Sequence, residues 1–278
     1  MASGSYRHPK CYANVNGGCS TTISGEHYIS HGLIKLYTFN DSKARILHDN
    51  GFGITHPVQP SRFVANVLCR EHNTQFHSYD DEAVKFASFL QRTALSFFEE
   101  KTWGNSETVA ISGDNLERWA LKLLLTHAAV NAYTGDGGRI TGRIPDYAVK
   151  VLLGEADWPR SGGLCVAGKK AHEHLIANPF SYEALVTGWW GAYPLFNKDQ
   201  PPALVGGIVE LAGIGLGICL DDRIRTMPQI LIPDNPMRHS IRRPSSLVWR
   251  IGEVEKRIQF TWADKEEHVD VTYIANVR

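Results

Sequence analysis

The sequence predicts an α+β fold in three consecutive regions, and three observations support this prediction. Residues 6–79 hold most of the histidines and three of the five cysteines. Residues 80–155 carry apolar side chains at helical spacing. Residues 156–278 contain short β-type runs separated by glycine, proline and aspartate. We therefore expect a small module rich in cysteine and histidine, a helical middle region, and a mainly antiparallel β-rich region at the C-terminus.

Two pairs of residues in the first region suit a tetrahedral metal ion. Cys69 and His72 have the spacing C-x-x-H, which places both side chains across one turn that leads into a helix. Cys11 and Cys19 form a looser pair with seven residues between them, and that segment is rich in asparagine and glycine, as a long turn requires. We expect these four residues to bind structural Zn²⁺. The alternative is two unrelated thiols and a surface histidine at a helix start.

Two helices are expected in the middle region. Asp80 and Asp81 can cap the first, and apolar residues at helical spacing follow them. Asp114 and Glu117 form a capping pair for the second, which ends at Gly135. The second helix is apolar on several faces, so we expect it to be mostly buried.

Three consecutive strands are expected in the tail, over residues 246–251, 256–262 and 268–274, with a turn at 263–266. The glycines of segment 213–217 lack the spacing of a nucleotide-binding loop and lie among strand-like residues, where glycine marks bends or close packing.

The composition excludes several classes of protein. With 43% hydrophobic and 21% charged residues the chain is globular rather than disordered. No secretion signal and no membrane-spanning run is recognisable, so we expect a cytoplasmic protein without a membrane partner. The 29 basic residues equal the 29 acidic ones, so a nucleic-acid contact needs a local patch. The densest basic cluster can grip phosphates or form a solvated loop balanced by acids, and it comprises Arg238, His239, Arg242 and Arg243.

A second, reactive group of residues lies around the two cysteine-containing pairs. A helix that begins near Cys69 would place Asn73 and His77, four residues apart, on the same side, where they could hold a divalent cation. Glu26 can supply a third ligand, and His27 beside it can take a proton from water. The cation would sit on a phosphate oxygen and the leaving group.

These residues resemble the HNH, or His-Me finger, endonucleases, whose ββα fold is braced by two zinc-binding pairs. The resemblance covers residues 6–79 only, and the residues that carry it are Cys11, Cys19, Glu26, His27 and the segment 68–73. It implies that His27 is the general base, that Glu26 stands beside it, and that Asn73 and His77 occupy the helix positions that bind catalytic Mg²⁺ or Mn²⁺. It also implies a hydrolase that cuts nucleic acid, DNA rather than RNA.

The sequence also departs from the family pattern. The first zinc pair is wider, the fourth zinc ligand is a histidine, and the stretch between His31 and Cys69 is longer than is usual. Asn73 in place of a helix histidine would weaken metal binding. His31 is either a further metal or phosphate ligand or a satisfied polar residue.

Two other interpretations of the whole chain therefore stay open. In one, Glu26 and His27 are a hydrogen-bonded pair in a non-catalytic, zinc-stabilised binding or scaffold protein whose β-rich region recognises the partner. In the other, the protein is a nuclease that stays silent until a partner or a small signal engages that region. We also expect that a protein partner or a second copy of the chain could bind through that region.

Overall fold

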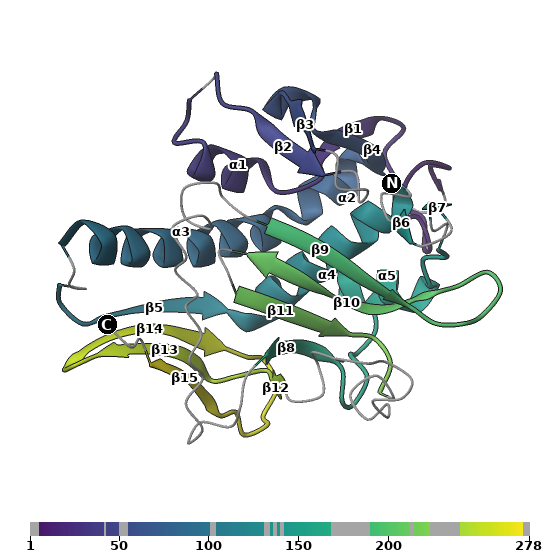
Figure 1. Cartoon of the computed structure of the whole chain (residues 1–278). Helices are drawn as coiled ribbons and strands as arrows, with labels where there is room; N and C mark the ends of the chain where they lie inside the picture. The colour runs from purple at the N-terminus through teal and green to yellow at the C-terminus, as the bar shows by residue number, and fades with distance from the viewer. Residues whose placement is uncertain are drawn as a thin grey trace.

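The described residues form five α-helices and mostly antiparallel sheets, which confirms the α+β class (Figure 1). It is given by a computed structural model of the chain. The residues that the structure describes are 6–41, 43–49, 55–100, 104–130, 134–135, 138–139, 142–167, 190–211, 214–222 and 240–274.

The N-terminal elements are built on a pair of strands followed directly by a helix. Strand β1 (Ile23–His27) runs antiparallel to β4 (Val64–Cys69), and α2 (Arg70–Gln75) begins where β4 ends. The long connection between the two strands has its own short elements, which are α1 (His31–Tyr37), β2 (Ile46–Asp49), β3 (Thr55–Val58) and a 3₁₀ turn over Pro60–Arg62.

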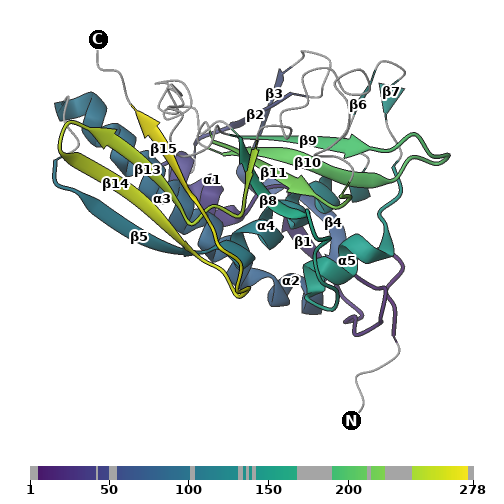
Figure 2. The same ribbon diagram turned by 90° about the horizontal axis from the view of Figure 1, so that it is seen from below.

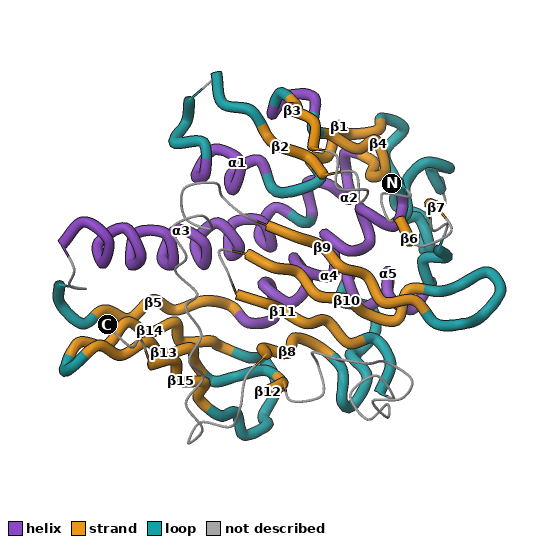
Figure 3. Tube along the Cα trace, viewed as in Figure 1, coloured by secondary structure: helices purple, strands orange, loops and turns teal. Residues whose placement is uncertain are grey.

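Two long helices, α3 (His77–Glu100) and α4 (Gly113–Ala129), form the centre of the molecule. The β1–β4 pair and α1 lie on one side of α3, and the four-stranded sheet described below lies on the other (Figures 1 and 3). Trp119 and the leucines of α4 are buried because this helix packs against α3 and against the larger sheet. The expectation of a mostly buried second helix is therefore confirmed.

Both helices begin differently from the sequence-based expectation. Helix α3 starts at His77, and the Asp80 carboxylate binds Lys122 instead of capping the helix. Helix α4 is capped by Ser112, whose hydroxyl accepts a hydrogen bond from the backbone N–H of Asn115. Glu117, expected in a capping pair, is fully buried and bound to an arginine. In both places the carboxylate is used for a tertiary ion pair, which a local pattern cannot reveal. Helix α4 also ends before the expected glycine, at Ala129.

The C-terminal half forms two sheets. The larger is antiparallel with the strand order β12-β8-β11-β10-β9. Its strands are β8 (Gly163–Ala167), β9 (Trp190–Phe196), β10 (Leu204–Leu211), β11 (Ile214–Cys219) and β12 (Ser240–Arg242). Gly215 and Gly217 belong to β11, as expected for glycines within a strand. The short elements between α4 and this sheet are β6 (Thr134–Gly135), β7 (Gly138–Arg139) and α5 (Asp146–Leu153).

The smaller sheet contains the three tail strands in the order β15-β13-β14-β5. Their bounds are Ser246–Ile251 for β13, Val254–Thr261 for β14 and Asp270–Ile274 for β15. Strand β15 returns to the far side of β13 and pairs with it in parallel, while β5 (Glu107–Ser112) pairs in parallel with β14. The expectation of three tail strands is confirmed, but only the β13–β14 pair of this sheet is antiparallel.

One hydrophobic core runs through all three sequence regions. Seen from below, the tail strands lie beside α3, and α4 lies behind the larger sheet (Figure 2). None of the described helices combines the length and the apolar character needed to cross a bilayer.

Gly32 sets the distance between α1 and α3. A Cβ atom at this position would lie 2.6 Å from Cγ2 of Val84, a β-branched side chain with little rotamer freedom. We expect Gly32→Ala to lower the free energy of unfolding by about 1–3 kcal/mol in urea titrations, as overpacking does. Adding Val84→Ala should recover part of this loss. Gly25→Ala is the matched control because no atom lies within 4 Å of its added Cβ; an equal loss in both single variants would contradict the steric explanation.

Candidate metal centre and the adjoining ion-pair cluster

Four side chains from separate parts of the N-terminal region converge on one point. Cys11 and Cys19 come from the loop before β1, Cys69 ends β4, and His72 lies in the first turn of α2. Their ligand atoms all lie within 4.8 Å of one another. Among the described residues, no other group of three or more His, Cys, Asp or Glu side chains meets in this way.

The spacing of these atoms fits a tetrahedral ion. Nδ1 of His72 lies 3.4 Å from Sγ of Cys11, 3.7 Å from Sγ of Cys19 and 3.3 Å from Sγ of Cys69. Metal bonds of about 2.1 Å to nitrogen and 2.3 Å to sulfur place tetrahedral S and N ligands about 3.6 Å apart. None of the three cysteines is in a disulfide. The cluster can therefore bind a metal ion, as the sequence predicted.

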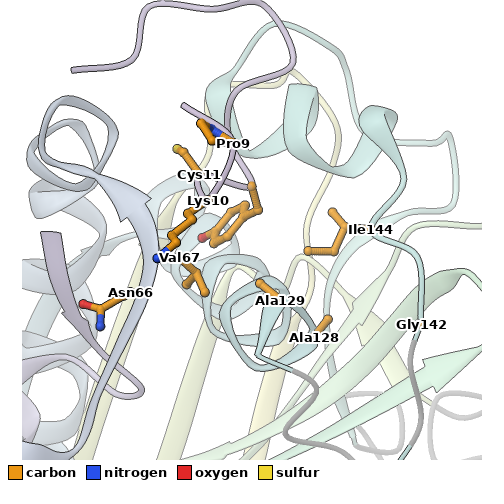
Figure 4. A pocket seen from close by; sticks show the side chains of 10 residues that line it. Pro9, Lys10, Cys11, Asn66, Val67, Ala128, Ala129, Gly142 and Ile144 are labelled. Carbon is orange, nitrogen blue, oxygen red and sulfur yellow. The ribbon is translucent and has the colours of Figure 1, made fainter. Parts of the chain in front are cut away.

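Backbone hydrogen bonds hold the two halves of the centre together. The N–H of Tyr12 donates to the carbonyl of Val67 at 3.0 Å, which ties the cysteine loop to β4. Gly17 and Gly18 both have positive φ, which explains why glycine stands at this turn. Residues of this loop, of β4 and of the end of α4 together line an open pocket of about 470 Å³ (Figure 4).

The protonation states couple metal binding to pH. Burial raises the pKa of the Cys11 thiol to about 12. Burial also acts to raise the pKa of Cys69, but hydrogen bonds from backbone groups of His72 and Ser20 outweigh it, so this pKa lies below its ordinary value. Burial lowers the pKa of His72, which keeps the imidazole neutral. A metal ion must therefore displace protons from buried thiols, and its binding weakens as the pH falls.

Next to the metal centre, a buried ion-pair cluster consists of Glu26, Asp80 and Lys122. Nζ of Lys122 lies 2.6 Å from Oε1 of Glu26 and 2.7 Å from Oδ2 of Asp80. The Ser30 hydroxyl donates to Asp80 and accepts a hydrogen bond from Nε1 of Trp119 at 2.9 Å. Burial lowers the pKa of Lys122, but the two carboxylates outweigh burial and raise it overall. Burial raises the pKa of Glu26 against the opposing effect of Lys122.

His27 is the last residue of β1 and lies beside this cluster. It lines a cavity of about 10 Å³ together with all three cluster residues, room for one water molecule at most. The imidazole of His31 stacks on that of His27, with ring centroids 4.7 Å apart and planes 6° apart. Burial lowers the pKa of His27, and His31 lowers it further. His27 is therefore neutral near pH 7 and able to accept a proton.

Asn73 and His77 are engaged differently from the sequence-based expectation. The expected single helix is divided at Phe76, whose fully buried side chain belongs to the core, so Asn73 lies on α2 and His77 begins α3. The Asn73 amide donates to the Ser24 hydroxyl at 2.9 Å, and His77 is exposed. Among the described His, Cys, Asp and Glu residues, neither Glu26 nor His77 belongs to a group of three that could hold a metal ion.

Sequence reasoning missed Lys122 and the true role of Asp80. Lys122 lies in a run of leucines on a helix that is apolar on all sides. A lysine is almost never fully buried unless it is paired, so its position was a signal that two or more acidic groups are near. The sequence does not say which acids they are.

The densest basic cluster of the sequence is not a free phosphate site where the structure describes it. Arg243 is buried and bound to Glu117 at 2.8 Å and to Asp264 at 2.5 Å. Arg242 binds Glu266 and the carbonyl of Gly162. The remaining two members of the cluster, Arg238 and His239, lie outside the described residues. Both arginines are balanced by acids, as expected, but Arg242 ends strand β12 and Arg243 is buried, so neither lies in a solvated loop.

Comparisons of the chain with protein-family models, with curated proteins and with solved structures find no match. The function must therefore be argued from the metal centre, the ion-pair cluster and His27.

Proposed function

We propose that the protein is an HNH-like endonuclease that hydrolyses phosphodiester bonds of nucleic acid, DNA rather than RNA, with His27 as its general base. The observation that carries this proposal is the place of His27. His27 is the last residue of β1, the first strand of a unit formed by β1, β4 and α2. Four side chains that could bind a metal ion converge at this unit. The general base of the HNH family occupies the corresponding place.

The metal ion at Cys11, Cys19, Cys69 and His72 is proposed to be Zn²⁺ with a structural role. Three thiolates and one imidazole are a donor set that zinc favours, and four protein ligands leave no open position for catalysis. The ion would brace the unit that presents His27.

His27 supports hydrolysis through its own protonation state. Because its pKa lies below the ordinary value, the imidazole is free to take a proton from an attacking water at neutral pH. Mg²⁺ or Mn²⁺ is the ion that the resemblance implies, and it would neutralise charge on the phosphate. Glu26 is held by Lys122 and Asn73 by Ser24, so these side chains as placed do not fit that ion, and we assign it no ligands here.

His27→Ala is expected to lower the rate of plasmid cleavage by about 10²–10⁴-fold, the usual contribution of a general base. Cleavage is measured by the conversion of supercoiled to nicked DNA with and without added Mg²⁺ or Mn²⁺, and the thermal unfolding temperature is compared in parallel. His268→Ala is the control, because this histidine lies in the tail beside Asp264. A wild-type protein that cuts no nucleic acid with any of these ions would refute the enzymatic proposal.

The second candidate is a non-catalytic, zinc-stabilised binding or scaffold protein. The observation that favours it is the pairing of Glu26 with Lys122, which gives the glutamate a structural role. This candidate predicts binding of a partner without turnover, and retention of that binding in His27→Ala.

A further inference from the structure

The insertion between β1 and β4, residues 31–62 and here named the basic arm, carries exposed cations without acidic partners. Lys35, Lys43, Arg45 and Arg62 are all exposed, and within the described part of the chain none of them forms an ion pair. Four arginines of the last part of the chain, at positions 242, 243, 250 and 257, pair instead with carboxylates. Solvent-facing charges without partners are available to a ligand.

The charge of this part of the chain differs from that of the whole. Residues 6–79 contain seven lysines and arginines against four acidic residues, whereas the whole chain has a net charge of zero. One of the four acids, Glu26, is already neutralised by Lys122. This stretch of the chain therefore carries a positive net charge, which favours a contact with nucleic acid.

The basic arm begins beside the proposed catalytic histidine, His27. His31, the first residue of α1, is exposed and stacks on His27. Lys35 follows four residues later, about 6 Å further along the helix, and is close enough for its charge to help lower the pKa of His31. Basic side chains thus extend from His27 along α1 toward the rest of the arm.

The β2–β3 hairpin presents a second surface of the arm. No other strand in the described residues pairs with it. Ile46 and Val58 face each other and pack on the core, whereas the neighbouring pair of Leu47 and Pro57 is exposed, with Leu47 71% accessible. Phe39, just after α1, is 61% exposed and has a φ of 51°, a conformation that bulky residues rarely adopt. These exposed apolar groups belong to the same segment of the chain as the exposed cations.

We propose that the basic arm binds the phosphate backbone of duplex DNA, with Lys35, Lys43 and Arg45 contacting phosphates. The identity of the partner rests on the proposed nuclease function. The charge of the arm carries the binding itself, which does not require turnover.

The test compares two triple variants with the same loss of charge. The first is Lys35→Gln, Lys43→Gln and Arg45→Gln in the arm. The control is Lys198→Gln, Lys265→Gln and Arg160→Gln, which changes three exposed residues of the C-terminal region, residues 156–278. Both triple variants are made in a His27→Ala background. Fluorescence anisotropy measures their binding to a labelled 30-base-pair DNA duplex and to an RNA duplex of equal length. The salt concentration is varied, and no Mg²⁺ or Mn²⁺ is added. Chelators are omitted so that the metal centre stays loaded.

The arm triple should weaken DNA binding at low salt by at least about tenfold and reduce the slope of log K against log salt by about one per contact removed. The control triple should change neither quantity appreciably. The proposal would be overturned by an equal loss of DNA affinity in both triple variants or by no loss in the arm triple. It would also be overturned by tighter binding of RNA than of DNA, or by no binding of DNA by the parent protein. DNA binding that depends on the arm in a wild type that cuts nothing would uphold this proposal and refute the nuclease.

Discussion

Removal of the metal ion is expected to unfold the β1–β4–α2 unit. Cys69 is fully buried at the point where β4 becomes α2, and the ion would join this point to the loop that carries Cys11 and Cys19. Structural zinc in small peptides contributes about 10–16 kcal/mol near pH 7, most of which appears as folding free energy. A chelator should therefore lower the melting temperature and the helical circular-dichroism signal together. Returning Zn²⁺ should restore both.

Cys69→Ser should have the same effect without a chelator and should reduce the zinc content from one ion per chain to a small fraction of one. Cys165→Ala is the control, because this cysteine is equally buried but lies in β8, away from the centre. Metal analysis that finds equal zinc in wild type and Cys69→Ser, or no zinc in either, would disprove the metal centre.

The cluster of Cys11, Cys19, Cys69 and His72, which could bind a metal ion, was predictable from the sequence because each of its halves is local. The C-x-x-H spacing of Cys69 and His72 and the glycine-rich turn between Cys11 and Cys19 each imply a short structure that presents two ligands. The chain then needs only to bring the two halves together. The tail strands and two long helices were predictable for the same reason, since periodicity is a local property.

The sequence did not reveal which residues pair with the buried charges, or which strands lie next to each other in the sheets. Strand β5 joins the tail sheet from the middle region, and no period or turn residue in either segment encodes that pairing. The acids expected to cap helices are used by Lys122 and Arg243, both of which are distant in the sequence. From its position beside His27, Glu26 was expected to bind a divalent metal ion. In the structure, the positive charge next to Glu26 is the ammonium group of Lys122 on α4.

Lys122→Met is expected to lower the free energy of unfolding by about 3–5 kcal/mol, because removal of one partner leaves buried charges without compensation. Lys122 is 3% exposed, and its removal would leave both Glu26 and Asp80 without a cation. Methionine fills a similar volume, so the loss reports on charge rather than on a cavity. Urea titration monitored by tryptophan fluorescence measures it, since Trp119 is joined to the cluster through Ser30.

The same loss should largely disappear when the two carboxylates are neutralised as well. We expect the triple variant Lys122→Met, Glu26→Gln, Asp80→Asn to be more stable than Lys122→Met alone, since replacing a whole buried ion pair by neutral groups is often close to neutral. The triple variant is then assayed under the conditions in which the wild type cuts DNA. If it is stable and also cuts DNA, the cluster only supports the strand that carries His27. If it is stable and inactive, at least one of Glu26, Asp80 and Lys122 acts on the substrate, because a purely structural role would have been satisfied by the restored fold.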